Sequence, residues 1–466
     1  MYSLANAIIN QDKQQIFRFL QHGEDVNGLD EYGFRPLIET AIVDNVELAS
    51  DLLRAGADPN LQDVLGGTAL HWAVENNNLP LCKLLVAHQA NLNQYNFAGQ
   101  PPLVMALLRN QKPLSKWLIK KGADRTFAQD FINIKLLGHL FELIGVVNLI
   151  TPDNQFVEVD FEGFFLEITL GVIADLVYQF QHHFAARSLR RYSGLMRFIA
   201  EILERAATLD KYTQYRVDVA QFEKIIDPLI RQDPLVIPVA YEGHAITFIR
   251  YSDIWVKCDR REDSRLYDNI MFYRMKNPSV LTTAFIKDLI YTPHPSEYIN
   301  KTLDHILQLD PITELKVEAQ ISGNCSWANV EATIPAIFFL VLYQLDKSGQ
   351  SIEQYKKAAL DFFHRFLEWS KDRALNFCIK RYNESDSIRK ASIAEILAAI
   401  LFQQHKHEVI DQKRVNLILE VLLPSSYTYI LDNYLRVYYY ERPTPEGKRF
   451  ADLLKQHGYL ASRSPR

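Results

Sequence analysis

The sequence predicts a multidomain α+β protein, with an N-terminal α-solenoid of repeats, a central α+β domain and a helical C-terminal region. A 33-residue unit recurs in the first quarter of the chain. Short segments with strand character follow near residues 235–259. After residue 345, apolar residues recur with helical spacing. With 466 residues, the chain has room for two or three domains.

The repeat is visible in two independent registers. Leu37, Leu70 and Leu103 occupy the same place in RPLIETAI, TALHWAVE and PPLVMALL, 33 residues apart. The turns GEDVN, GADPN, QANLN and GADRT begin at residues 23, 56, 89 and 122, with the same spacing. This pattern resembles the ankyrin repeat and covers residues 1–127 in about four copies. The resemblance implies a solenoid that binds a protein partner through contact residues that the sequence does not identify.

Single residues of the repeat have predictable structural roles. Thr68 is placed to cap a helix, and Ala69, Leu70 and Ala73 are expected to face the neighbouring repeat. His71 belongs to the hydrogen-bonding pattern of the repeat, so we do not expect it to bind a ligand.

Two further regions are predicted to be helical. Residues 128–153, which include FINIKLLGHLFELIGVVNLI, are interpreted as an apolar capping or junction helix. Residues 346–466 contain several amphipathic helices that begin at Ser or Asp. The region between them, residues 154–345, is the predicted α+β domain.

Composition argues against several function classes. The net charge is −5, so no overall basic field attracts nucleic acid or anionic lipid. Arg187, Arg190, Arg191 and Arg197 form a local basic stretch that we interpret as a solvated helix face. No glycine-rich phosphate loop, dinucleotide motif or metal-ligand spacing occurs, so we expect no cofactor and no metal.

The thiols and the N-terminus indicate a reducing compartment. Cys82, Cys258, Cys325 and Cys378 are scattered without a Cys-x-x-Cys pair, which argues against a disulfide framework. The N-terminal segment lacks the pattern of a classical signal peptide. The longest apolar stretch, residues 332–343, is shorter than a bilayer span.

The central region contains a candidate acid–base pair. Three strands are predicted over residues 235–240, 244–250 and 254–259, with a tight turn at Ser252. In an antiparallel hairpin, His244 and Asp259 then lie near one another at the same end. The carboxylate could fix the imidazole tautomer that a general base needs.

A candidate nucleophile follows in QISGNCSW. Cys325 begins an apolar helix, where free N–H groups and the helix dipole stabilise a thiolate. Ser322 or Asn324 could cap that helix, and Gln320 could donate an N–H to an oxyanion. Cys258 is a rival thiol, but strand alternation places it on the face opposite Asp259.

The order His244, Asp259, Gln320, Cys325 resembles cysteine proteases of the SUMO-protease and adenoviral-protease type and YopJ-type acetyltransferases. Gln320 stands one residue closer to the cysteine than in those families. The resemblance implies a base, an orienting acid, an oxyanion donor and a nucleophile, in that order, for cleavage of a peptide or isopeptide bond. A vestigial pocket in a non-catalytic binding module, or an acyltransferase, remains an alternative.

The combination of ankyrin repeats with a thiol-protease-like module resembles ankyrin-repeat effectors of Legionella. That resemblance implies delivery by a type IV secretion system into a host cell, where a host protein binds the repeats. The compartment implied is the host cytoplasm or nucleus.

Overall fold

The computed structural model describes residues 3–151, 155–161, 164–213, 219–260, 270–320, 323–345, 351–404 and 409–459. It forms two compact units, each discontinuous in sequence. The first comprises Met1–Lys135, Gly145–Asp160 and Cys378–Arg466, and the second comprises Leu136–Ile144 and Phe161–Phe377. The domain boundaries predicted from the sequence, after residues 127, 153 and 345, stay a prediction.

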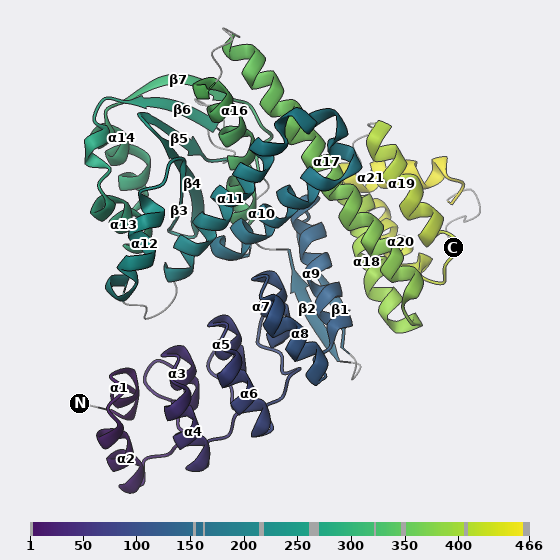
Figure 1. Ribbon diagram of the computed structural model, residues 1–466. Helices are drawn as coiled ribbons and strands as arrows, with labels where there is room; N and C mark the ends of the chain where they lie inside the picture. The colour runs from purple at the N-terminus through teal and green to yellow at the C-terminus, as the bar shows by residue number, and fades with distance from the viewer. Residues whose placement is uncertain are drawn as a thin grey trace. The chain divides into compact units, whose positions relative to one another are not determined.

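The first unit begins with four helix pairs, as the repeat predicts, and Figure 1 shows them in succession from purple to blue. Their bounds are α1 Leu4–Ile9, α2 Lys13–Gln21, α3 Pro36–Ile42, α4 Val46–Arg54, α5 Ala69–Glu75, α6 Leu79–Ala87, α7 Pro102–Leu108 and α8 Lys112–Lys121. Ala69, Leu70 and Ala73 are almost fully buried, as expected of residues that face a neighbouring repeat.

The capping of α5 follows the prediction. Thr68 is its N-cap in a capping box, and the Thr68 backbone N–H donates to His71 Nδ1 at 3.1 Å. The other ring nitrogen, His71 Nε2, donates to the Gln100 carbonyl oxygen at 3.0 Å. Burial lowers the pKa of His71 to about 4, so the ring is neutral and acts as a structural connector between repeats.

The rest of the first unit combines a β-hairpin with helices. Strands β1 Val146–Ile150 and β2 Phe156–Asp160 pair antiparallel. The helices and turns are α18 Ser387–Gln404, α19 Val409–Leu422, α20 Thr428–Leu435, η6 Arg436–Glu441 and α21 Pro445–Gln456. Two long helices, α9 Arg125–Leu140 and α17 Ile352–Glu384, each contribute residues to both units.

The predicted junction helix over residues 128–153 is correct only as far as Leu140. Glu142 has φ +47°, a left-handed conformation that ends the helix, and the Leu143 N–H closes back on the Gly138 carbonyl oxygen. After Gly145, also left-handed, the β-branched pair Val146 and Val147 enters β1.

Gly447 in α21 lies against the backbone of η6. A Cβ at this position would overlap the carbonyl group of Tyr438, which cannot rotate away. We therefore expect Gly447→Ala to lower the free energy of unfolding by about 2 kcal/mol, the usual cost of overpacking, in urea denaturation. Gly171→Ala in α10 (Leu166–His182) is the control, because a Cβ there meets nothing within 4 Å. That control should gain about 0.5–1 kcal/mol from helix propensity, and an equal gain in Gly447→Ala would contradict the expectation.

The second unit contains a five-stranded antiparallel sheet in the order β3-β4-β5-β6-β7. The strands are β3 Leu235–Tyr241, β4 His244–Tyr251, β5 Ile254–Cys258, β6 Ile270–Met275 and β7 Leu309–Leu315. Its helices and turns are α10 Leu166–His182, η1 Phe184–Tyr192, α11 Ser193–Asp210, η2 Lys211–Thr213, η3 Val219–Phe222, α12 Glu223–Ile230, η4 Pro278–Val280, α13 Thr283–Tyr291, η5 Tyr298–Thr302, α14 Leu303–Leu307, α15 Cys325–Glu331 and α16 Thr333–Leu345.

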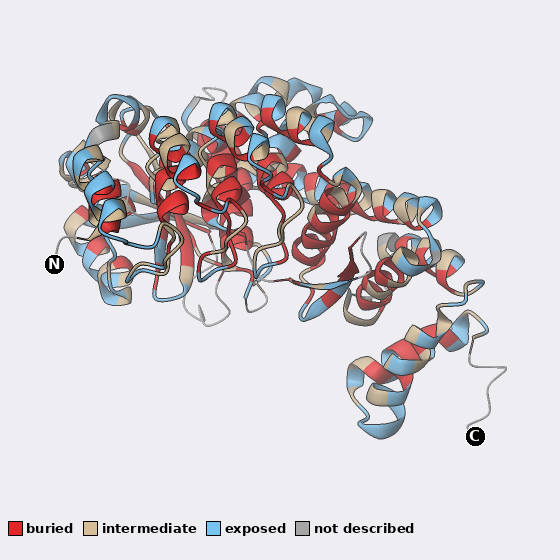
Figure 2. Cartoon of the chain, turned by 90° about the horizontal axis from the view of Figure 1, so that it is seen from below, coloured by how far each residue is buried: buried red, intermediate tan, exposed pale blue. Residues whose placement is uncertain are grey.

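The three predicted strands are observed within one residue of their expected ends, and Ser252 lies in the turn with φ +55°. β6 and β7 were not expected. The sheet has apolar residues on both faces: the fully buried Phe248 and Trp255 lie on one face, and the buried Ile249 and Val256 on the other. Figure 2 shows buried positions alternating with exposed ones along many helices, so each such helix turns one face toward the interior of its unit.

The apolar segment Cys325–Gln344 is, at 20 residues, long enough to cross a membrane. This length exceeds the stretch expected from the sequence, because α15 and α16 follow one another almost without a break. Within the fold, 89% of its most apolar window is buried, which is the environment of a core helix.

The architecture is therefore an ankyrin solenoid, a mixed region with two sheets, and a helical C-terminal region, as the sequence predicted at this level. The more specific likeness of the mixed region to a cysteine-protease fold stays a prediction.

Candidate active site

His244 and Asp259 meet at one end of the β4–β5 hairpin. The register pairs Thr247 with Cys258, which places the first residue of β4 near the residue that follows β5. His244 Nε2 lies 3.0 Å from Asp259 Oδ1, and the two side chains are 15% and 16% exposed. The hairpin thus makes the contact that the sequence predicted, and a ring nitrogen that faces a carboxylate is held as the N–H tautomer.

Cys325 begins α15, which packs against β4, and its thiol hydrogen-bonds to His244. Burial by itself would raise the pKa of the Cys325 thiol. The hydrogen bond to His244, the charge of that ring, and the backbone N–H groups of Ala245 and Ser326 outweigh burial and lower this pKa below that of an ordinary thiol.

The other three thiols lie in different surroundings. Cys82, Cys258 and Cys378 are fully buried or nearly so, whereas Cys325 is partly exposed. Burial raises the pKa of Cys82 to about 12 and raises those of Cys258 and Cys378 further. Cys258, the rival nucleophile, is therefore a core residue of β5.

Gln320 is held close to this group by its backbone. Its N–H donates to the carbonyl oxygen of Arg260, the residue after Asp259, at 2.8 Å. Its side-chain oxygen Oε1 is buried without a hydrogen-bond partner in the described part of the chain. The role of its amide as an oxyanion donor stays a prediction.

The residues before Cys325 differ from the expected cap. Asn324 occupies the N-cap position, but its side chain makes no capping hydrogen bond. Instead, Asn324 Oδ1 accepts a hydrogen bond from His139 Nδ1 at 2.9 Å, and the His139 ring stacks on Trp327. Gly323 has φ +87°, which glycine adopts without strain. Ser322, the other predicted cap, lies outside the described residues.

Arg260 is a functional candidate that the sequence analysis missed. Its guanidinium is 5% exposed and contacts two carboxylates, Glu331 Oε2 at 3.2 Å and Glu142 Oε1 at 3.0 Å. Its Nε donates to the Glu318 carbonyl oxygen at 2.6 Å. One side chain thus connects the helix that carries Cys325 with the segment that carries Gln320.

Asn329 completes this connection. Its Oδ1 accepts the Arg260 backbone N–H at 2.7 Å, and its Nδ2 donates to the carbonyl oxygen of Ala245, the residue after His244. Asn329 is fully buried and stands one helical turn after Cys325. Polar residues within an otherwise apolar helix, here Asn329 and Glu331, were the available signal, because buried polar groups need partners.

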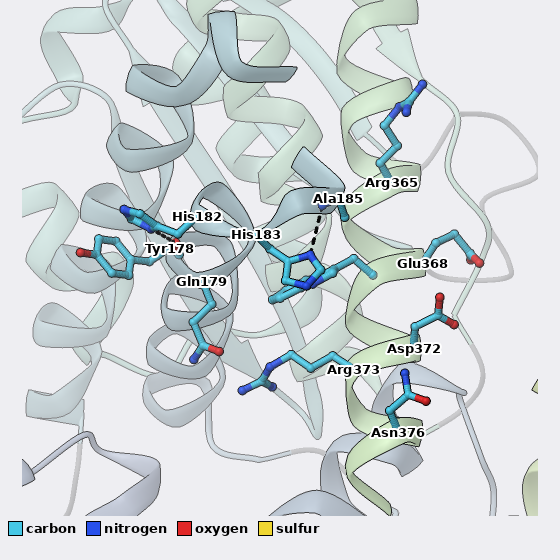
Figure 3. Close-up of a pocket in the computed structure, with 11 residues that line it drawn as sticks. Tyr178, Gln179, His182, His183, Ala185, Arg365, Glu368, Asp372, Arg373 and Asn376 are labelled. Carbon is cyan, nitrogen blue, oxygen red and sulfur yellow. Dashed lines mark hydrogen bonds between the residues drawn. The ribbon is translucent and has the colours of Figure 1, made fainter. Parts of the chain in front are cut away.

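A separate hollow of about 930 Å³ lies in the same unit, between α10 and α17, and Figure 3 shows its lining. None of the four predicted site residues lines it. His183 lies toward α17 and contacts Trp369, whereas His182 turns toward Tyr178, so the adjacent histidines diverge. Within the described ranges, no cluster of three or more His, Cys, Asp or Glu side chains could hold a metal ion.

The chain resembles one solved structure over its full length. The structure of the Legionella effector AnkH matches it with a TM-score of 0.90 and 37% sequence identity, over 99% of this chain and 98% of that chain. The chain belongs to the AnkH family.

Further similarities cover part of this AnkH relative. A family model described as ankyrin repeats, three copies, matches residues 37–128. Inversin from Gallus gallus is 33% identical over 116 residues, and a putative ankyrin repeat protein from Rickettsia felis is 32% identical over 117 residues. Each match covers 25% of this chain, but only 10% of inversin and 30% of the Rickettsia protein. The AnkH match, which covers 99% of this chain, extends over the candidate active site.

Proposed function

We propose that this protein is an effector that binds a host protein through its ankyrin repeats and cleaves a peptide or isopeptide bond at Cys325. The observation that carries the proposal is the chain of contacts from the Cys325 thiol to His244 and from His244 to Asp259. Such an arrangement activates a thiol as a nucleophile.

In this mechanism, His244 takes the proton of the Cys325 thiol, and the sulfur attacks the substrate carbonyl carbon. A C–S bond forms while the carbonyl oxygen becomes an oxyanion. Gln320 supplies an N–H donor to that oxygen. When the C–N bond breaks, His244 gives its proton to the departing amine, leaving a thioester. Water then attacks the thioester with His244 as base, which releases a carboxylic acid and restores the thiol.

The repeats offer a surface for the partner. Large apolar side chains stand exposed at the hairpin tips of successive repeats: Leu29, Tyr32, Val64, Leu65 and Phe97, at 53–77% exposure. Backbone contacts join the tips, from Val64 N to Gly33 O and from Phe97 N to Leu65 O. Neighbouring apolar groups of this kind mark protein interaction sites. Likeness to a Legionella effector supports action inside a host cell, and we propose delivery by a type IV system into the host cytoplasm or nucleus.

Alkylation by iodoacetamide tests the thiol. Because the pKa of Cys325 is lowered, its alkylation rate should rise with pH and level off below the range of a free cysteine, near 8.5. Mass spectrometry of the digested protein should find Cys325 modified and Cys82, Cys258 and Cys378 protected in the folded chain. A rate that keeps rising through pH 9 would contradict the proposed activation.

Turnover separates the alternatives. A library of fluorogenic peptide amides should be cleaved by the wild type and not by Cys325→Ala. If alkylation shows an activated thiol and no amide or isopeptide is cleaved, the protease assignment fails. In that case, acetyl transfer from a thioester donor to lysine peptides would identify an acyltransferase, and its absence a binding module.

A further inference from the structure

A second hollow, of about 430 Å³, lies in the first unit. None of its lining residues belongs to the candidate active site. Residues of β1, β2, α18, α20 and η6 line it: Asn148, Ile150, Phe156, Ala391, Ser392, Glu395, Tyr429, Ile430, Asn433, Tyr434, Val437 and Tyr438. These elements are labelled or can be followed by colour in Figure 1. A volume of this size holds one side chain or a small molecule.

The lining is aromatic on several sides. Phe156 and Tyr429 are 72% and 51% exposed, although large apolar residues are normally covered. Tyr434 and Tyr438 stack on one another, with ring centroids 6.0 Å apart, and both contact Phe402 behind them. Because Phe402 packs against both rings, Tyr434 and Tyr438 are held in fixed orientations before a ligand binds.

The pocket contains one charged group. Glu395 is the only charged residue among the lining residues described, and its Oε2 lies 3.4 Å from the Asn148 backbone N. Burial raises the pKa of Glu395, and the Asn148 N–H opposes this rise only in part. Burial also raises the pKa of Tyr434 to about 12, and the Glu395 charge adds to this rise. Both residues line the same hollow.

The charge selects the kind of ligand. Glu395 is half-buried, and a half-buried carboxylate with no cation among the described lining residues gains from a positive partner. Aromatic faces attract the same charge, and aromatic rings around an ammonium group are the usual recognition of quaternary ammonium and methyl-lysine. Glu395 would repel an anionic ligand. A neutral ligand would not neutralise the charge of Glu395.

We propose that this pocket binds an organic ammonium ion, supplied as the lysine or methylated lysine side chain of a protein partner. Its size favours a side chain, and the ankyrin repeats of the same chain are a protein-binding structure. π-Helical turns such as η6, which carries Val437 and Tyr438, recur at functional sites. The proposal is independent of the chemistry at Cys325.

Calorimetric titration of the full chain tests the charge. Choline and 3,3-dimethylbutan-1-ol have the same shape, but only choline is charged. We expect choline to bind at least tenfold more tightly than the alcohol, and Glu395→Gln to remove that preference. Equal affinities for the two probes, or a preference that survives Glu395→Gln, would overturn the proposal.

Two tyrosine variants test the location. Tyr429→Leu should weaken choline binding at least fivefold, whereas Tyr440→Leu should not change it, since Tyr440 is equally exposed but does not line the pocket. Equal loss in both variants would place the binding elsewhere.

A short peptide with one trimethyl-lysine tests the source of the ammonium group. It should bind at least tenfold more tightly than choline, because its backbone adds contacts at the rim. Affinity no higher than that of choline would overturn the assignment to a peptide side chain.

Discussion

His244→Ala should slow the alkylation of Cys325 at pH 7 by about 10- to 100-fold. Burial raises the pKa of this thiol, and the imidazole lowers it through a hydrogen bond and through its charge. Without it, the pKa of the thiol rises toward or above that of a free cysteine, and each pH unit of that rise removes about nine-tenths of the thiolate present at neutral pH. The measurement is the rate of iodoacetamide labelling at Cys325 between pH 5 and 10.

Two variants serve as comparisons for this experiment. Asp259→Asn keeps a hydrogen-bonding side chain beside His244 but removes its charge, so we expect a smaller loss than in His244→Ala. His305→Ala removes an exposed histidine of the same unit and should leave the rate unchanged. If His244→Ala labels at the wild-type rate, the thiol is not activated by the imidazole and the proposed mechanism fails.

Arg260→Met should lower the free energy of unfolding by about 3–5 kcal/mol, the usual cost of removing one partner from a buried ion pair. The substitution leaves Glu331, which is 7% exposed, and Glu142 without the cation between them. Burial already raises the pKa of Glu331, and the Arg260 charge works against that rise. Urea denaturation followed by the fluorescence of the second unit measures the loss.

The pH dependence of this loss has a definite sign. In Arg260→Met, the pKa of Glu331 in the folded state rises further above its unfolded value, so the folded state binds the extra proton. Stability therefore falls as pH rises through the window between the two values, and the deficit is smallest in mild acid. Adding Glu331→Gln should recover part of the loss at neutral pH. A deficit that is independent of pH and unaffected by Glu331→Gln would show that Arg260 acts through packing alone.

The elements of the site were predictable because each depends on local pattern. Short apolar runs over residues 235–259 predicted the strands, and the short turn at Ser252 predicted a register that places His244 near Asp259. The start of the apolar segment gave Cys325 at a helix N-terminus. Strands β6 and β7 were missed, because in the sequence they stand apart from that hairpin and have no comparable turn signal.

The supporting groups were not predictable, because their partners are distant in sequence. Arg260 contacts Glu142 across 118 residues and Glu331 across 71, and no periodic pattern links such positions. The pocket around Glu395 is a similar case. Its lining comes from a hairpin and three helical segments that only packing brings together.

By itself, the sequence determined the repeat solenoid and the hairpin that joins His244 to Asp259. The solenoid follows from the period of 33 residues, and the hairpin follows from short apolar runs joined by a tight turn; local backbone geometry converts both directly into structure. Only the tertiary structure decided that Cys325 reaches His244, that its pKa falls while those of the other three thiols rise, and that Glu395 lies among tyrosines. Burial and charge around a group depend on which distant segments pack against it, and that information is absent from the spacing of residues along the chain.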